Sequence, residues 1–122
     1  MSRAGARYSE DEVAVCFYIA RFGRESVGGM ARAAAALRRN EVSCKVRNIV
    51  EMCLHYGVCA VADEFTPKEL TQDEYYKGLS GVRAGAQVRK TDFEIVERLA
   101  QKSQSELQDI IRPAFPGLRF SP

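Results

Sequence analysis

Three Ser/Thr-x-x-Glu motifs constrain the fold of this 122-residue chain most strongly, because such capping boxes mark the first turns of α-helices. The motifs run from Ser9 to Glu12, from Thr91 to Glu94 and from Ser103 to Glu106. Apolar residues recur at helical spacing after each motif, as in amphipathic helices. We therefore predict an amphipathic helix over residues 10–22 and two helices over residues 91–112, with Pro113 and Pro116 closing the last one.

Two more helices are predicted before Gly57, a residue suited to the position after a helix end. Ser26 is expected to cap the first, and Asn40 to cap the second, which runs from Glu41 to about His55. The predicted buried stripes are Met30, Ala33, Ala34 and Leu37 in the first, and Val42, Val46, Ile49, Val50 and Cys53 in the second. The outer face of the second is expected to carry Cys44, Asn48, Glu51 and His55. Three short helices with brief connections predict a tri-helical, helix-turn-helix-like unit over residues 8–57.

The chain beyond residue 57 is less regular. Residues 58–66 have the apolar content of a short extended segment, and Pro67 is suited to start a brief helix. Residues 77–90 contain three glycines and four basic residues but no acid, which predicts an irregular Gly-rich basic loop. Residues 58–90 are therefore expected to form an irregular connection. Apolar residues make up 46% of the chain, so we predict a mainly α fold with one modest core and a single domain over residues 1–122.

Few residues are suited to catalysis. The one histidine, His55, lies near a predicted helix C-terminus, where a cation interacts favourably with the helix dipole. The chain contains no GxxxxGK[ST] or GxGxxG phosphate loop. Most acidic residues fall in the first turns of predicted helices, where capping explains them. We therefore expect a protein that is not an enzyme and needs no cofactor.

The four cysteines, at positions 16, 44, 53 and 59, form no CxxC pair. Cys53, His55 and Cys59 are close enough in sequence to suggest a zinc site, with Cys44 as a fourth ligand. Structural zinc sites have recognisable paired spacing, which this set lacks. Free thiols and no metal are therefore the prediction.

Basic residues are concentrated in two elements. The first fifty residues hold nine Lys/Arg against five Asp/Glu, although the net charge of the whole chain is only +2. The candidate nucleic-acid-binding residues are Arg38, Arg39, Lys45, Arg47 and Asn48 on or before the third helix, and Arg83, Arg89 and Lys90 in the loop. Arg47 and Asn48 are suited to base edges, since Arg pairs with guanine and Asn with adenine, and the other cations to phosphates. The pattern predicts binding of double-stranded DNA; an ordinary solvated helix face is the alternative.

The same segments carry a family resemblance. The matching motifs lie in four groups along the chain: Tyr8, Ser9, Glu10 and Glu12; Arg38 and Arg39; Lys45, Asn48 and Ile49; and Ser80, Gly81, Gly85, Arg89, Thr91, Phe93 and Val96. Over residues 8–100 the chain resembles a Myb-like or helix-turn-helix-like domain that precedes HNH-type nuclease domains in some restriction endonucleases. It departs from that pattern at Glu41, where a small residue is expected, and it has no His/Asn/His nuclease cluster. The resemblance implies a DNA-recognition module that acts as a regulator or target-recognition subunit.

Protein partners are the alternative. The resemblance also allows a phage or mobile-element protein that blocks a host defence complex. In the tail, residues 113–122, the apolar side chains of Phe115, Leu118 and Phe120 are candidates for docking on a partner or on a second copy of the chain. Folding of the tail onto its own core is the simpler expectation, and binding of a small anionic ligand by residues 77–90 is a third possibility. No bilayer-length apolar run or signal-like segment is present, so we expect a soluble cytoplasmic protein without membrane contact.

Overall fold

The computed structural model describes residues 7–66 and 90–122, which form α-helices, short 3-10 helices and no strand. The α-helices are α1 (Glu10–Phe22), α2 (Met30–Leu37), α3 (Ser43–Tyr56), α5 (Lys90–Leu99) and α6 (Gln104–Ala114). The 3-10 helices η1 (Arg24–Val27) and η2 (Asp63–Phe65) follow α1 and α3. The predicted mainly α fold is confirmed. The helix predicted after Pro67 and residues 77–89 of the predicted loop lie outside the described residues.

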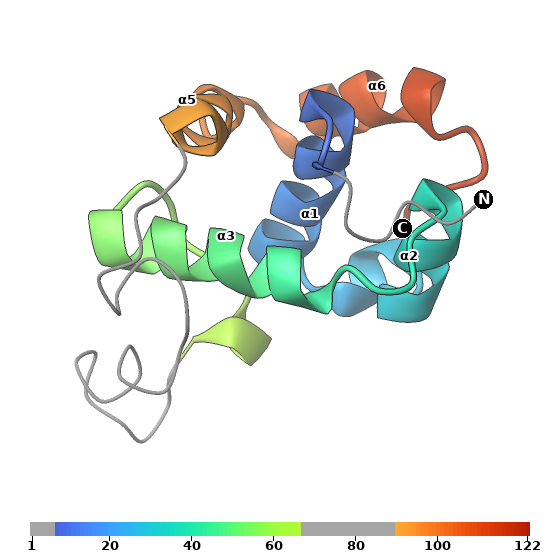
Figure 1. Cartoon of the computed structure of the whole chain (residues 1–122), viewed down its shortest axis with the longest axis horizontal. Coiled ribbons are helices and arrows are strands. Elements are labelled where there is room, and N and C mark those ends of the chain that lie inside the picture. Colours follow the sequence, from blue (N-terminus) through green and yellow to red (C-terminus); the bar gives the residue numbers. More distant parts are fainter. Residues whose placement is uncertain (1–6, 67–89) are drawn as a thin grey trace.

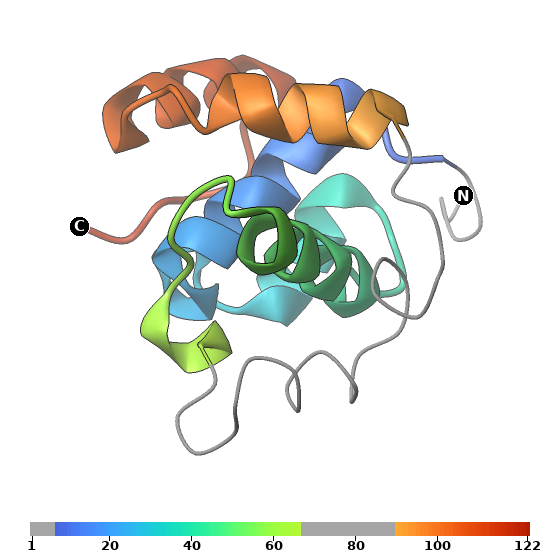
Figure 2. The ribbon, with the colours of Figure 1, turned by 90° about the vertical axis from the view of Figure 1, so that its left-hand side faces the viewer.

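Helix α1 lies at the centre of the fold (Figure 1). It contacts α3, α5 and α6, and Figure 2 shows α5 and α6 on the opposite side of α1 from α2 and α3. Every residue from Val13 to Ala20 is buried. The helix predicted over residues 10–22 is confirmed, but its predicted amphipathic character is wrong for this stretch, because segments from both halves of the chain cover α1.

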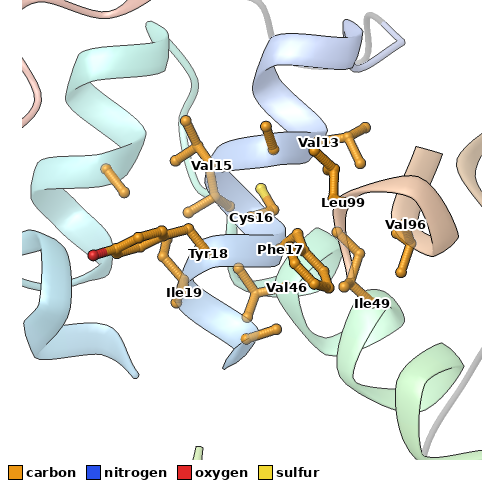
Figure 3. Close-up of a cluster of buried hydrophobic side chains, with 14 of the residues drawn as sticks. Val13, Val15, Cys16, Phe17, Tyr18, Ile19, Val46, Ile49, Val96 and Leu99 are labelled. Atoms are coloured by element: carbon orange, nitrogen blue, oxygen red, sulfur yellow. The ribbon is translucent and has the colours of Figure 1, made fainter. Parts of the chain in front are cut away.

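Apolar side chains of three helices meet around Phe17 (Figure 3). Phe17 points from α1 toward Val46 and Ile49 of α3, and Val96 and Leu99 of α5 lie beside them. All five side chains are buried. Burying one such side chain contributes about 1.5–3 kcal/mol to folding, so this cluster holds α3 and α5 against α1.

Two of the three predicted capping boxes are confirmed. The Ser9 hydroxyl accepts a hydrogen bond from the Glu12 amide at 3.2 Å, and the Glu12 carboxylate accepts from the Ser9 amide at 2.9 Å. Ser103 and Glu106 make the same pair of bonds at the start of α6. The third prediction is wrong, because α5 already begins at Lys90 and Thr91 therefore lies inside the helix.

The starts of α2 and α3 differ from the prediction. Ser26 lies in η1 and donates to the Gly23 carbonyl at 2.5 Å, whereas α2 begins at Met30 after Gly29, whose φ of +105° suits glycine. Helix α3 begins at Ser43 with Val42, and not Asn40, at the N-cap position, and the Glu41 side chain binds the first turn. The Glu41 carboxylate accepts hydrogen bonds from the Ser43 hydroxyl at 2.6 Å and the Cys44 amide at 3.0 Å.

The segment after α3 returns to the end of α1. Gly57, with a φ of +65°, ends α3 as predicted. Residues 58–66 contain η2 instead of an extended strand, and the Ala62 amide donates to the Ala20 carbonyl at 2.9 Å. At the other end of the chain, Pro113 lies in the last turn of α6, which ends at Ala114, two residues later than predicted. None of the helices in the described ranges has the length and apolar character needed to cross a membrane.

Candidate nucleic-acid interface

Helices α2 and α3 are joined by the five residues 38–42, a connection as brief as predicted. Arg38 ends α2 in the left-handed conformation with a φ of +57°, which costs a non-glycine residue about 1 kcal/mol. The Arg38 and Arg39 amides donate to the last carbonyls of α2, those of Ala35 and Ala34, at 3.1 and 2.9 Å. Val42 is buried and anchors the far end of the connection.

Arg39 is not on the predicted interface. Its Nε and Nη2 atoms donate to the Glu12 carboxylate at 2.7 and 3.1 Å, and Nη2 also donates to the Arg7 carbonyl at 3.0 Å. The side chains of Arg39 and Glu12 are only 3% and 2% exposed, and the Tyr8 ring covers the guanidinium at 3.6 Å. This ion pair fixes the connection to α1, so the phosphate-binding role predicted for Arg39 is corrected to a structural one.

Lys45 is also occupied by the fold. Its Nζ lies 2.6 Å from the Asp92 carboxylate, and both side chains are 14% exposed. The ammonium also lies 5.2 Å from the centre of the Tyr8 ring. The pair joins α3 to α5. The phosphate-binding role predicted for Lys45 is therefore also corrected to a structural one, because a phosphate would have to displace Asp92 to reach this cation.

Arg38 and Arg47 are exposed as predicted, and Asn48, which follows Arg47 on α3, is half-buried. The outward side of the first half of α3 is formed by Ser43, Cys44 and Arg47, with Arg47 one turn after the other two. Arg47 also lines a groove of about 230 Å³ together with Arg24, Met30, Ser43, Val46, Val50, Glu64, Phe65 and Thr66. Glu51, predicted on the outer face, is buried instead.

Sequence reasoning missed Arg32, an exposed residue of α2. The sequence did indicate that Arg32 is exposed, because it lies outside the apolar stripe of α2 and therefore on the solvent side. Arg32, Arg38 and Arg47 form no ion pair with the residues that the structure describes. Helices α2 and α3 and their connection therefore present three exposed arginines outside the ion pairs of the described residues.

The N-terminus of α3 is not available to an anion. Glu41 occupies the Cys44 amide, and the hydrogen bonds from Ser43 and Cys44 lower the pKa of its carboxyl group. The resulting carboxylate would repel a phosphate at this end of the helix. Of the loop residues, Arg83 and Arg89 lie outside the described residues, and only the backbone of Lys90 is described, as the first residue of α5.

The residues predicted to dock a partner pack on the protein itself. Leu118 is 5% exposed, and the ring of Phe120 lies 4.8 Å from that of Tyr18. Phe115 packs against the same core. Ser121 fastens the end of the tail, with its amide donating to the Ser26 carbonyl at 2.8 Å and its hydroxyl to the Glu25 carbonyl at 2.6 Å. The simpler expectation, a tail folded on its own core, is thus confirmed, and the docking role is not supported.

No group of three metal-ligating side chains is found within residues 7–66 and 90–122. Cys53 and Cys59 do come together, with their sulfur atoms 3.8 Å apart. Cys44, the fourth ligand considered for zinc, is exposed on α3, where it forms part of the outward side described above.

Comparisons with protein family models, with curated proteins and with solved structures find no match to this chain. The resemblance to the domain associated with HNH-type endonucleases therefore stays a prediction from the motifs.

Proposed function

We propose that this chain is a non-enzymatic protein that binds double-stranded DNA through the unit formed by α2 and α3. The observation that carries the proposal is the set of exposed arginines Arg32, Arg38 and Arg47 on that unit, which form no ion pair with residues 7–66 or 90–122. Glu64, which lines the same groove as Arg47, pairs with Arg24 at 2.6 Å. In this proposal the chain acts as a regulator or target-recognition subunit, as its motifs suggest.

The outward side of α3 suits a groove of DNA. The major groove is about 12 Å wide and admits one α-helix. Ser43 and Cys44 are small, so they permit the helix to approach base edges closely, and Arg47 and Asn48 have the donors that read guanine and adenine. Arg32 and Arg38 then contact the phosphates on either side.

The number of cations sets the expected salt dependence. If about three phosphates are neutralised, the logarithm of affinity should fall with the logarithm of salt concentration at a slope of about −2.7. Arg39 and Lys45 do not contribute to this number, because Glu12 and Asp92 already hold them.

The alternative, a protein–protein interaction module, has less support. Within the described residues, the exposed large apolar side chains are Tyr56 and Ile110, which lie on different helices. The tail that motivated this alternative is packed on the core.

The test is fluorescence anisotropy of a labelled random duplex of about 30 base pairs, titrated at several salt concentrations. Arg47→Glu should weaken binding at least tenfold, because it removes a favourable charge and adds a repulsive one. Arg119→Glu is the matched control, since Arg119 is also an exposed arginine but lies in the tail. Equal effects of the two reversals, or no binding at low salt, would refute the proposal.

A further inference from the structure

The end of α3 brings two cysteines into contact. Cys53 lies in the last turns of the helix, where its carbonyl accepts the amides of Gly57 and of Val58, the latter at 2.9 Å. The left-handed turn at Gly57 reverses the chain direction and returns Cys59 to the helix. The two sulfur atoms consequently lie 3.8 Å apart, in hydrogen-bond contact.

The two thiols differ in their surroundings. Cys53 is 1% exposed, whereas Cys59 is half-buried and reachable from solvent. The contact with the Cys53 sulfur, together with the positive charge of Arg21, lowers the pKa of Cys59 to about 7. The same contact and burial raise the pKa of Cys53. Arg21 is held in place by a hydrogen bond to the Lys102 carbonyl at 2.8 Å. Of the two thiols, Cys59 is therefore the one that ionises more readily.

We propose that Cys53 and Cys59 are a peroxide-sensitive pair that forms a reversible intramolecular disulfide. The Cys59 thiolate attacks one oxygen of hydrogen peroxide, the O–O bond breaks, and Cys59 becomes a sulfenic acid while hydroxide leaves. The Cys53 sulfur then attacks the Cys59 sulfur, the S–O bond breaks, and the oxygen leaves as water with the thiol proton. A thiol reductant reverses the reaction by exchange.

The geometry permits this step with a small movement. A disulfide needs a sulfur–sulfur distance of about 2.05 Å, so the present 3.8 Å must shorten by less than 2 Å. Cys59 lies in the irregular segment between α3 and η2, whose backbone is not held by a helix. The other two cysteines are in different environments. Burial raises the pKa of Cys16 to about 12, and Cys44 is exposed on the outward side of α3.

The test uses the full chain with Cys44→Ser, which removes the exposed thiol and its intermolecular disulfides. The protein is treated with hydrogen peroxide, unfolded, alkylated and digested with trypsin. Cys53 and Cys59 fall in one tryptic peptide, residues 48–68, because no Lys or Arg lies between Arg47 and Lys68. We expect this peptide to lose about 2 Da, the two thiol hydrogens, and to resist alkylation until dithiothreitol is added.

Two variants assign the roles. Cys53→Ser should leave Cys59 as a sulfenic acid that dimedone labels after peroxide treatment, and Cys59→Ser should give no labelled peptide. Circular dichroism establishes that each variant is folded, and Cys59→Ser, at the half-buried position, is the milder change. The proposal is overturned if peptide 48–68 of the Cys44→Ser protein keeps two alkylatable thiols after peroxide, or if Cys59 is oxidised only to sulfinic acid.

Discussion

Arg39 and Glu12 form a buried ion pair in which two guanidinium nitrogens donate to one carboxylate, at 2.7 and 3.1 Å. The pair joins residues 27 positions apart in the chain, the start of α1 and the connection between α2 and α3. Glu12 also accepts the Ser9 amide in the capping box of α1. One carboxylate therefore sets both the start of the central helix and the position of the helix-turn-helix-like connection.

Replacing Arg39 should destabilise the protein strongly. Arg39→Met leaves the Glu12 carboxylate buried without its cation, which typically costs about 3–5 kcal/mol. The free energy of unfolding from urea titration measures the loss. Arg38→Met is the matched control, because Arg38 is the exposed neighbour and its substitution should change stability by less than about 0.5 kcal/mol. Similar losses in both variants would contradict a special role for the buried pair.

The sequence predicted local contacts in this fold but not contacts between distant residues. The capping boxes at Ser9 and Ser103 were predictable, because the two partners lie three residues apart. Helical spacing also predicted the buried stripe of α3, although it placed the buried Glu51 on the outer face. The different environments of Arg38 and Arg39 were not predictable, because the partner of Arg39 lies 27 residues away.

The same limit applies to Lys45 and Arg47. Asp92, the partner of Lys45, is 47 residues distant, and nothing in the local pattern separates this lysine from its exposed neighbour. For the candidate interface, local spacing predicted which helices carry charge. It did not predict which charges the fold uses.

Charge reversal at these two positions should therefore have different consequences. Lys45→Glu places a carboxylate against Asp92 in a half-buried site and should cost about 2 kcal/mol of stability, within the range between exposed and buried pairs. Arg47→Glu should leave the urea midpoint nearly unchanged, because Arg47 is exposed. Combining Lys45→Glu with Asp92→Lys should recover much of the lost stability. A Lys45→Glu protein as stable as the wild type would show that this ion pair contributes nothing to folding.

The tail should behave as part of the core. Leu118→Ala removes a nearly buried side chain and should lower the free energy of unfolding by about 2–4 kcal/mol. The neighbouring Arg119→Ala, at an exposed position, serves as control and should have little effect. Urea titrations of both variants measure the free energy of unfolding. If Leu118→Ala unfolds at the wild-type midpoint, the packing of the tail does not contribute to stability in solution.

The reactivity of Cys59 should rise with pH around neutrality. Only the thiolate reacts with iodoacetamide, so a pKa of about 7 predicts an alkylation rate at peptide 48–68 that increases through pH 7 and levels off above it. Arg21→Gln removes a positive charge that favours the thiolate, so the midpoint should move to higher pH and the rate at pH 7 should fall. Arg24→Gln, at the adjoining η1, is the matched control and should leave the midpoint in place. A midpoint near 9, the ordinary value for a thiol, in the wild type would show that neither Cys53 nor Arg21 activates Cys59.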